Sequence, residues 1–156
     1  MVTVATLCFV LKGREVLLLL KSEGRFGGGK WNGLGGKLIE GETPLGCVKR
    51  EVMEESGLEV PALEFQGTLY FRFGDDPLRD WLVHVYSTKE FNGEPRPSEE
   101  GELRWFPLGD IPYQEMWEDD RHWLPLVLKG ATVNGRFQFD DDGTRLLSFE
   151  VEEVAK

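Results

Sequence analysis

The feature that most limits how this chain can fold is a glycine-dense stretch that leads into a sharply delimited helix. The stretch runs from Gly24 to Gly36, where the backbone can approach other groups closely. Downstream, Thr43 is a good N-cap, Pro44 suits the first helical position, and Gly57 ends the helix. Helical spacing separates the apolar residues Leu45, Val48 and Val52. The sequence therefore predicts a glycine-rich stretch followed by one helix with defined ends.

The predicted helix carries three carboxylates on one face. Glu51, Glu54 and Glu55 stand at positions i, i+3 and i+4. Like charges so close together repel one another, and a cation between them removes the repulsion. Carboxylate oxygens suit Mg²⁺ or Mn²⁺. Taken alone, these residues are more typical of a solvated acidic helix face, because such faces are common.

The neighbouring residues favour a metal site over a solvated face. The segment Gly35-Gly36-Lys37 can bring backbone close to a ligand. Glu42 lies just before the helix cap, and Arg50 stands beside the glutamates, where bidentate pairing could brace them.

The rest of the chain alternates between strand and helix patterns. Strands are predicted at Thr3–Leu11, Val16–Leu20, Leu63–Phe73, Trp81–Thr88, Glu102–Phe106 and Arg145–Val151. The segment Ala131–Phe139 carries Asn134-Gly135, which predicts a hairpin turn. A second helix is capped by Asp119 or Asp120 and runs to about Leu128. This order predicts the α/β class, with one mixed sheet between helices in a single domain spanning residues 1–156.

Composition narrows the range of partners. The net charge of −10 argues against polymeric nucleic acid, which needs a basic surface, but a bound metal can still hold a small phosphorylated ligand. The longest apolar run, Val16–Leu20, is far too short to span a membrane, and no signal peptide is recognisable. Cys8 and Cys47 lie in apolar patterns and are expected to be reduced, which suits the cytoplasm.

One motif resembles a known signature. Gly36, five residues, Glu42, seven residues and then Arg50–Leu58 match the pattern of the Nudix hydrolase family at every fixed position. The resemblance implies an α/β/α sandwich that binds Mg²⁺, with Mn²⁺ as a possible substitute, and hydrolyses a nucleoside diphosphate linked to another group. It also implies metal ligands at Glu51, Glu54, Glu55 and the Gly35 carbonyl.

Two further roles stay open at this stage. The family usually takes another acidic ligand from a distant loop, and Glu100 is the candidate here, although it also reads as a surface loop charge. A carboxylate must accept a proton from the attacking water, and either Glu51 or Glu55 could do so.

A longer resemblance points to the substrate. The segments Phe26–Lys37 and Met116–Leu126 resemble the MutT-homologue branch of the family, and the likeness extends from about Thr3 to Phe149. That branch removes oxidised purine nucleoside triphosphates such as 8-oxo-dGTP and 2-oxo-dATP. The resemblance places these residues among the substrate contacts: Thr6, Lys21, Phe26, Leu34, Gly35, Gly36 and Lys37.

The chemistry of several residues agrees with a purine pocket. Trp117 can stack on a flat base, and Asn32 can read a base edge with both a donor and an acceptor. Asp119 and Asp120 are adjacent carboxyls, so burial and repulsion would raise at least one pKa and let the pair read several oxidised purines by shifting a proton. The remaining candidates, which would close the pocket, are Phe71 and Phe73.

Each of these residues also has a purely structural interpretation. Asp119 can be an ordinary N-cap, Trp117 a core residue, and Asn32 part of a turn with Gly33. His84 and His122 have no partners at ligand spacing and are expected to be structural.

The chain also departs from the branch. Trp81 and Gly101 stand where the branch has methionines, Thr68 replaces a glutamine, and one residue is inserted between Leu20 and Phe26. Trp81 in particular could reshape the base site. Alternatives are therefore a Nudix enzyme for ordinary or methylated dNTPs or dinucleoside polyphosphates, and a nucleotide sensor without turnover. We expect a monomer that binds a small nucleotide and no membrane.

Overall fold

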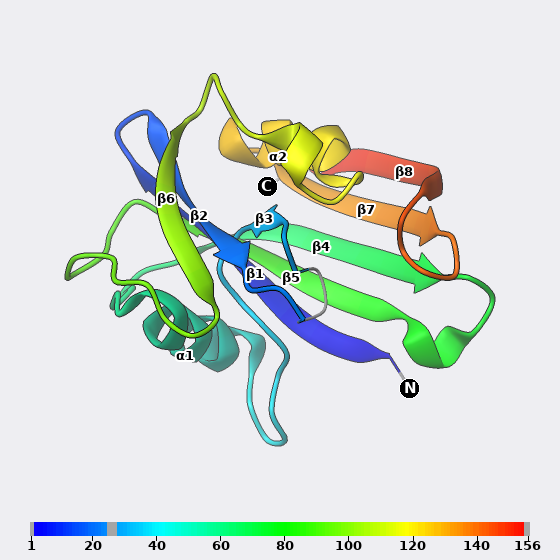
Figure 1. Cartoon of the computed structure of the whole chain (residues 1–156), viewed down its shortest axis with the longest axis horizontal. Helices are drawn as coiled ribbons and strands as arrows, with labels where there is room; N and C mark the ends of the chain where they lie inside the picture. The colour runs from blue at the N-terminus through cyan, green and yellow to red at the C-terminus, as the bar shows by residue number, and fades with distance from the viewer. Residues whose placement is uncertain (1, 25–27, 155–156) are drawn as a thin grey trace.

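The computed structural model describes residues 2–24 and 28–154, and within these residues one mixed sheet lies between two α-helices (Figure 1). The strands are β1 Thr3–Lys12, β2 Glu15–Lys21, β3 Trp31–Asn32, β4 Glu64–Phe73, β5 Trp81–Thr88, β6 Gly101–Pro107, β7 Thr132–Phe139 and β8 Leu146–Val154. The helices are α1 Pro44–Ser56 and α2 Asp120–Leu128, with short 3₁₀ helices η1 Pro77–Arg79 and η2 Tyr113–Glu115. The predicted fold class is confirmed.

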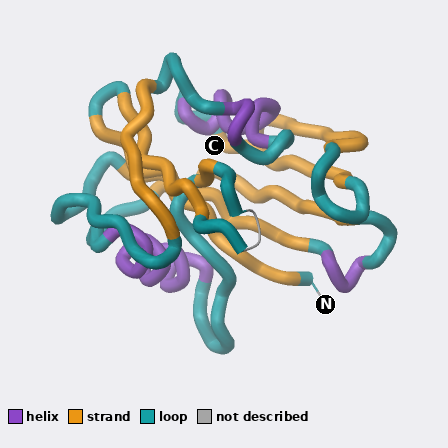
Figure 2. The backbone as a smooth tube through the Cα atoms, in the orientation of Figure 1, coloured by secondary structure: helices purple, strands orange, loops and turns teal. Residues whose placement is uncertain are grey.

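The sheet follows the order β3-β2-β1-β5-β4-β7-β8, with β6 paired to β2. The pairs β1–β5 and β4–β7 are parallel, and the other pairs are antiparallel. β6 pairs along the whole of β2, so β1 and β3 share the other edge of that strand. Figure 2 shows the two helices on opposite sides of this sheet.

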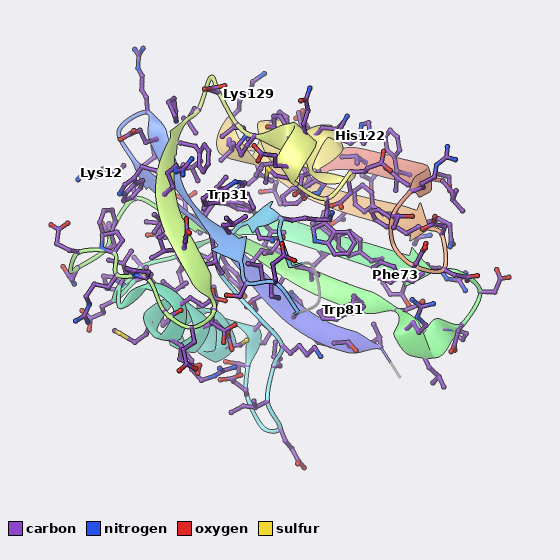
Figure 3. All side chains as sticks on the ribbon, viewed as in Figure 1. Lys12, Trp31, Phe73, Trp81, His122 and Lys129 are labelled. Atoms are coloured by element: carbon purple, nitrogen blue, oxygen red, sulfur yellow. The ribbon has the colours of Figure 1, made fainter. Side chains whose placement is uncertain are left out.

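The sheet separates two apolar cores. Trp123, Leu124 and Val127 of α2 pack against one face, where Trp31 is also buried (Figure 3). On the other face, Val48 and Val52 of α1 pack against the sheet. The run Val16–Leu20 serves both cores, which explains why it does not alternate with polar residues.

The ends of α1 lie where the sequence predicts them. Thr43 Oγ1 accepts a hydrogen bond from the Gly46 N–H at 3.0 Å. Gly57 adopts φ 76° and donates its N–H to the Met53 carbonyl at 2.8 Å, which closes the helix. Val48 and Val52 of the predicted apolar face are buried, whereas Leu45 is exposed.

Two other expectations concern membranes and disulfides. Among the described residues, no helix is both long enough and apolar enough to cross a membrane. Cys8 and Cys47 are buried and free, in agreement with the expectation that they are reduced.

The hairpin turn predicted at Asn134-Gly135 is wrong. Both residues lie inside β7, where Gly135 pairs with Leu69 on one side and Val151 on the other. The turn between β7 and β8 is formed instead at 140–145, where the Asp140 N–H donates to the Arg145 carbonyl at 3.0 Å. Gly135 serves packing rather than turning, because a Cβ there would lie 2.7 Å from the ring of Phe137.

Gly135→Ala should therefore destabilise the fold. Phe137 is fully buried, so its ring cannot move away from the added methyl group without disturbing the core. Overpacking of this kind costs about 1–3 kcal/mol, or roughly 2–10 °C in Tm for a chain of this size. Urea and thermal unfolding measure the change. Gly109→Ala is the matched control, since a Cβ at Gly109 meets nothing within 4 Å; equal stability of the two variants would contradict this packing.

Candidate active site

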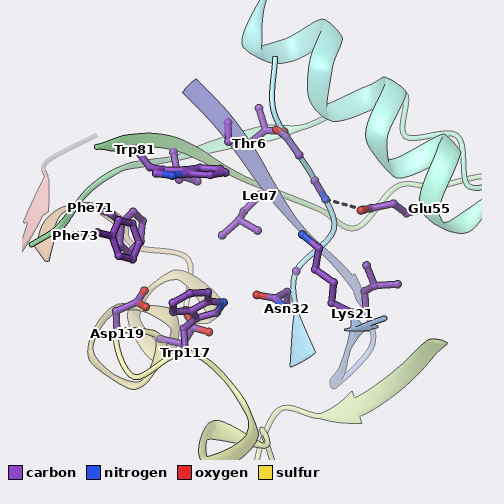
Figure 4. A pocket seen from close by; sticks show the side chains of 17 residues that line it. Thr6, Leu7, Lys21, Asn32, Glu55, Phe71, Phe73, Trp81, Trp117 and Asp119 are labelled. Atoms are coloured by element: carbon purple, nitrogen blue, oxygen red, sulfur yellow. Dashed lines mark hydrogen bonds between the residues drawn. The ribbon is translucent and has the colours of Figure 1, made fainter. Parts of the chain in front are cut away.

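A cavity of about 150 Å³ lies between one face of the sheet and the loops that precede α1 and α2 (Figure 4). We call it the central cavity. It is lined by Ala5, Thr6, Leu7, Leu19, Lys21, Asn32, Gly33, Gly35, Gly36, Glu55, Phe71, Phe73, Trp81, Val83, Trp117, Asp119 and Asp120.

The sheet supplies the floor of the cavity. Ala5 stands opposite Val83 in the β1–β5 pair, and Phe71 stands opposite Trp81 in the β4–β5 pair. Side chains on a strand alternate between faces, so these residues and Phe73 share one face of the sheet. The strand register therefore makes a continuous apolar floor from residues far apart in the sequence.

The segment before α2 supplies the opposite wall. Trp117 packs edge-on against Phe73 and Phe139, with ring centroids 6.3 and 5.7 Å apart. Figure 4 shows Trp117 across the cavity from Trp81. The cavity is thus a slot with an indole ring on each side.

A pair of buried carboxyls lies beside Trp117. Asp119 and Asp120 are 2% and 7% exposed. Asp119 makes no side-chain capping bond to α2; its Oδ2 instead accepts from the indole N–H of Trp123 at 2.7 Å. Asp119 thus occupies the predicted N-cap position of α2, but its carboxylate contributes to the cavity wall instead of capping the helix.

The two carboxyls have different affinities for a proton. Burial raises the pKa of Asp119 to about 6, against the opposing effect of the Trp123 hydrogen bond. Burial and the charge of Asp119 raise the pKa of Asp120 well above its usual range. A hydrogen bond between them lowers the first pKa and raises the second. Both shifts favour retention of a proton by the pair, and Asp120 holds it more tightly than Asp119.

At the other end of the cavity lies Glu55 of α1, the helix that carries the three glutamates. We call α1 the acidic helix. Glu55 is only 3% exposed, and its Oε1 accepts from the Gly35 N–H at 2.8 Å (Figure 4). Burial raises the pKa of Glu55 to about 8, opposed by this hydrogen bond. The charges of Glu51 and Glu100 raise it further, whereas the Lys21 ammonium lowers it.

Arg50 braces the acidic helix, as expected. Its Nε and Nη2 donate to the Glu42 carboxylate at 2.7 and 3.0 Å, and these bonds are the main reason that the pKa of Glu42 falls to about 2. Its Nη1 donates to Glu51 at 2.6 Å and to Glu54 at 3.0 Å, and Nη2 also reaches the Lys37 carbonyl at 3.1 Å. One guanidinium therefore ties the helix to the preceding loop.

The donors at this end of the cavity are chemically suited to a divalent cation. Carboxylates are hard oxygen ligands. Burial raises the pKa of Glu51, and the charges of Glu54 and Glu100 raise it further, against the opposing effect of Arg50. The backbone approaches the carboxylates closely, because a Cβ on Gly36 would lie 2.6 Å from the Glu51 carboxyl. Among residues 2–24 and 28–154, however, no three His, Cys or acidic side chains already enclose an ion site. Arg50 and Gly35 N–H engage them instead.

Most of the substrate-contact residues predicted from the sequence line the central cavity. These are Thr6, Lys21, Asn32, Gly35, Gly36, Phe71, Phe73, Trp117, Asp119 and Asp120. Glu55, predicted only as a catalytic and metal residue, lines it as well.

Three predicted contacts lie elsewhere. Leu34 does not line the cavity, since its backbone pairs with Cys8 and its side chain is buried in the core beneath α1. Lys37 is exposed outside the cavity lining, with its Nζ 5.3 Å from the centre of the Trp81 ring. Phe26 falls outside the described residues.

Of the two residues that stand where the family branch has methionines, one lines the central cavity and the other does not. Trp81 lines the cavity, whereas Gly101 pairs with Lys21 at the start of β6 and does not. The floor residues Ala5, Leu7 and Val83 were not predicted from the sequence. Alternation along their strands marks them as inward-facing, but only the strand order shows that they meet.

Comparisons with known proteins agree with this geometry. The family model described as NUDIX domain matches residues 1–127. A mouse protein named oxidized purine nucleoside triphosphate hydrolase is 45% identical over 150 residues, which cover 96% of this chain and 94% of the mouse protein. A Danio rerio protein of the same name is 43% identical over 150 residues, which cover 96% of this chain and 94% of that protein. The crystal structure of a MutT protein from Bacillus halodurans matches with a TM-score of 0.85 and 29% identity, covering 97% of this chain and 98% of that one.

The buried carboxyl pair predicts how stability depends on pH. The folded protein keeps a proton on Asp120 that the unfolded chain releases near pH 4, so this contribution is present at low pH and lost as pH rises. Asp120→Asn keeps a donor toward Asp119 without the titration. We expect its stability relative to the parent to grow as pH rises above about 4, by up to about 1.4 kcal/mol per pH unit, until the folded pair loses its proton.

Urea denaturation of the parent and Asp120→Asn, without metal, measures this slope at each pH. Asp110→Asn, at an exposed loop position, is the control and should show a constant difference from the parent. A constant difference for Asp120→Asn as well would mean that the pair holds no extra proton.

Proposed function

The chain belongs to the Nudix hydrolase family, and we propose that it hydrolyses oxidised purine nucleoside triphosphates to the monophosphate and pyrophosphate. Substrates of the 8-oxo-dGTP and 2-oxo-dATP type fit best. The observation that carries the proposal is the central cavity, which joins an aromatic slot with a proton-sharing carboxyl pair to the acidic face of α1. Such an enzyme removes damaged precursors from the nucleotide pool.

The base end of the cavity supports recognition of more than one oxidised purine. Protonated Asp120 donates to a base carbonyl, and ionised Asp119 accepts from a base N–H. Asn32 offers a carbonyl and a second N–H, since its Nδ2 already donates to the Lys30 carbonyl at 3.0 Å. Trp117 supplies a stacking surface for the ring.

The phosphate end supports hydrolysis. We propose Mg²⁺ as the ion, replaceable by Mn²⁺; when bound, it neutralises charge on the phosphate oxygens and stabilises the transition state. The residues that would hold it are Glu51, Glu54, Glu55, Glu100 and the Gly35 carbonyl. Lys21 adds a positive charge beside Glu55, where the polyphosphate would enter.

We assign the role of proton acceptor to Glu55 rather than Glu51. Glu55 lines the cavity, within reach of a water that attacks the phosphate chain. Its raised pKa would fall once a divalent ion is bound beside it, which would leave the carboxylate ionised and able to accept the proton. Glu51 does not line the cavity and is paired with Arg50 at 2.6 Å. Arg50 acts as a positioning residue, because it holds Glu51 and Glu54 at a fixed place on the helix.

The same proposal covers the setting in which the enzyme works. One domain spanning residues 1–156 would act as a monomer on free nucleotides in the cytoplasm. The net charge of −10 disfavours polymeric nucleic acid as a partner.

A panel of triphosphates tests the proposed activity. Pyrophosphate release with Mg²⁺ should give a higher kcat/KM for 8-oxo-dGTP and 2-oxo-dATP than for dGTP and O6-methyl-dGTP. Oxidation gives guanine an additional N7–H and C8 carbonyl, and gives adenine an N1–H and a C2 carbonyl, which the carboxyl pair can bind. Excess chelator should abolish release, and added Mg²⁺ should restore it. A preference for dGTP would refute removal of oxidised nucleotides, and binding without any release would indicate a sensor.

Glu55→Gln tests the assignment of the proton acceptor. A positioned general base contributes about 10²–10⁴-fold in rate, so kcat for 8-oxo-dGTP should fall at least a hundredfold. The amide has nearly the same shape, and the protein should fold normally by circular dichroism. The control is Glu64→Gln, an exposed residue at the start of β4, which should keep parental kcat. Turnover within tenfold of the parent would rule out Glu55 as the base.

A further inference from the structure

We propose that Ser22 is a positioning residue that holds Glu100 beside the glutamates of α1 for binding of a divalent cation. The inference rests on the proposed function, since it takes Glu100 as one of the metal ligands. Ser22 does not line the central cavity, so it would act through the loop of residues 98–101, which we call the Glu100 loop.

Ser22 fixes the backbone on both sides of Glu100. Its hydroxyl donates to the Glu99 carbonyl at 2.9 Å, and its N–H donates to the Glu100 carbonyl at 2.9 Å. Within the loop, Ser98 Oγ accepts from the Glu100 N–H at 3.1 Å. Both peptide groups next to the Glu100 Cα are therefore held. Of the two bonds that come from Ser22, substitution with alanine removes only the one from its hydroxyl.

Gly101 lets the Glu100 loop lie close against β2. It pairs with Lys21 and adopts φ 155°, and a Cβ there would lie 1.9 Å from the Leu20 carbonyl oxygen. A larger residue would therefore push the loop away from β2 and from Ser22, which follows this strand. Gly101 stands where the family branch has a methionine, so the family pattern does not imply this close approach.

The Glu100 loop brings a carboxylate close to the acidic helix. Glu100 is half-buried, whereas the neighbouring Glu99 is exposed. The charge of Glu100 raises the pKa of both Glu51 and Glu55, so the three carboxylates repel one another when no cation lies between them. That repulsion pushes Glu100 away from α1, and the bonds from Ser22 oppose it. A cation that binds there does not have to order the loop, which increases its affinity.

Binding of Mn²⁺ in the absence of nucleotide tests the inference without turnover. Electron paramagnetic resonance measures free Mn²⁺ and thus the Kd of the protein for this ion alone. For Ser22→Ala, the Kd should rise about three- to tenfold, as expected for loss of one hydrogen bond that holds a ligand in place. Ser22→Thr keeps the hydroxyl and should stay within twofold of the parent.

A double-mutant cycle separates positioning of Glu100 from a general structural effect of Ser22. Glu100→Gln removes the charged ligand and should raise the Kd for Mn²⁺ at least fivefold. In that background, Ser22→Ala should change the Kd less than twofold, because the carboxylate that Ser22 positions is gone. A merely structural role for Ser22 would instead give the same loss in both backgrounds.

Two variants serve as matched controls. Glu99→Gln makes the same change of charge in the same loop, but at an exposed side chain. Ser148→Ala removes the hydroxyl of an exposed serine on β8, a strand that does not pair with β2 or β6. The Kd for Mn²⁺ should stay within twofold of the parent in both.

Several outcomes would overturn the inference. They are a Ser22→Ala Kd less than threefold above that of the parent, an equal loss in the Glu100→Gln background, and a parent that binds no Mn²⁺ at millimolar concentration. If Ser22→Ala does not fold by circular dichroism, Ser22→Cys, whose thiol is a weak donor, must bind Mn²⁺ at least threefold more weakly than Ser22→Thr. The proposed activity is judged separately, because pyrophosphate release by the parent with Mg²⁺ does not depend on these variants.

Discussion

The close passage of residues 34–36 between β1 and α1 is the contact on which the rest of the site depends. Leu34 and Gly36 bond to the backbone of Cys8 and Thr6, and the Gly35 N–H donates to Glu55. A Cβ on Gly35 would lie 2.0 Å from the Thr6 carbonyl oxygen, so only glycine fits there. This passage brings the acidic helix to the end of a cavity that the other side of the sheet builds. Without it, the base slot and the carboxylates would belong to separate parts of the molecule.

The sequence predicted the fold well where local chemistry decides the structure. Both ends of α1 follow from Thr43, Pro44 and Gly57, because capping depends only on near neighbours. The turn predicted at Asn134-Gly135 failed for the opposite reason: both of those residues are paired with strands on each side, and non-local pairing overrides a turn preference. The two-residue strand β3 has no period of its own and exists only because β2 lies beside it.

In the candidate site too, features fixed by local sequence could be predicted, and features that depend on distant residues could not. The spacing of the glutamates on α1 and the Arg50 contact could be predicted, since one helix fixes their geometry. Asp119 has the residue type of an N-cap, and only the position of Trp123 shows that its carboxylate faces elsewhere. The floor residues needed the order of β1, β5 and β4, which the sequence does not contain. Leu34 was misplaced because the glycines beside it let the backbone turn its side chain into the opposite core.

The outermost strand, β8, has a consequence for how molecules of this protein meet. In the described part of the chain it pairs only with β7, so its other side presents backbone groups to solvent. Leu147 and Phe149 are exposed along it, a combination that invites strand-to-strand aggregation. Glu150, Glu152 and Glu153 lie on the same strand, so pairing the β8 edges of two molecules would bring their carboxylates close together. Electrostatic repulsion along this edge therefore opposes the addition of a neighbouring copy's strand to the sheet.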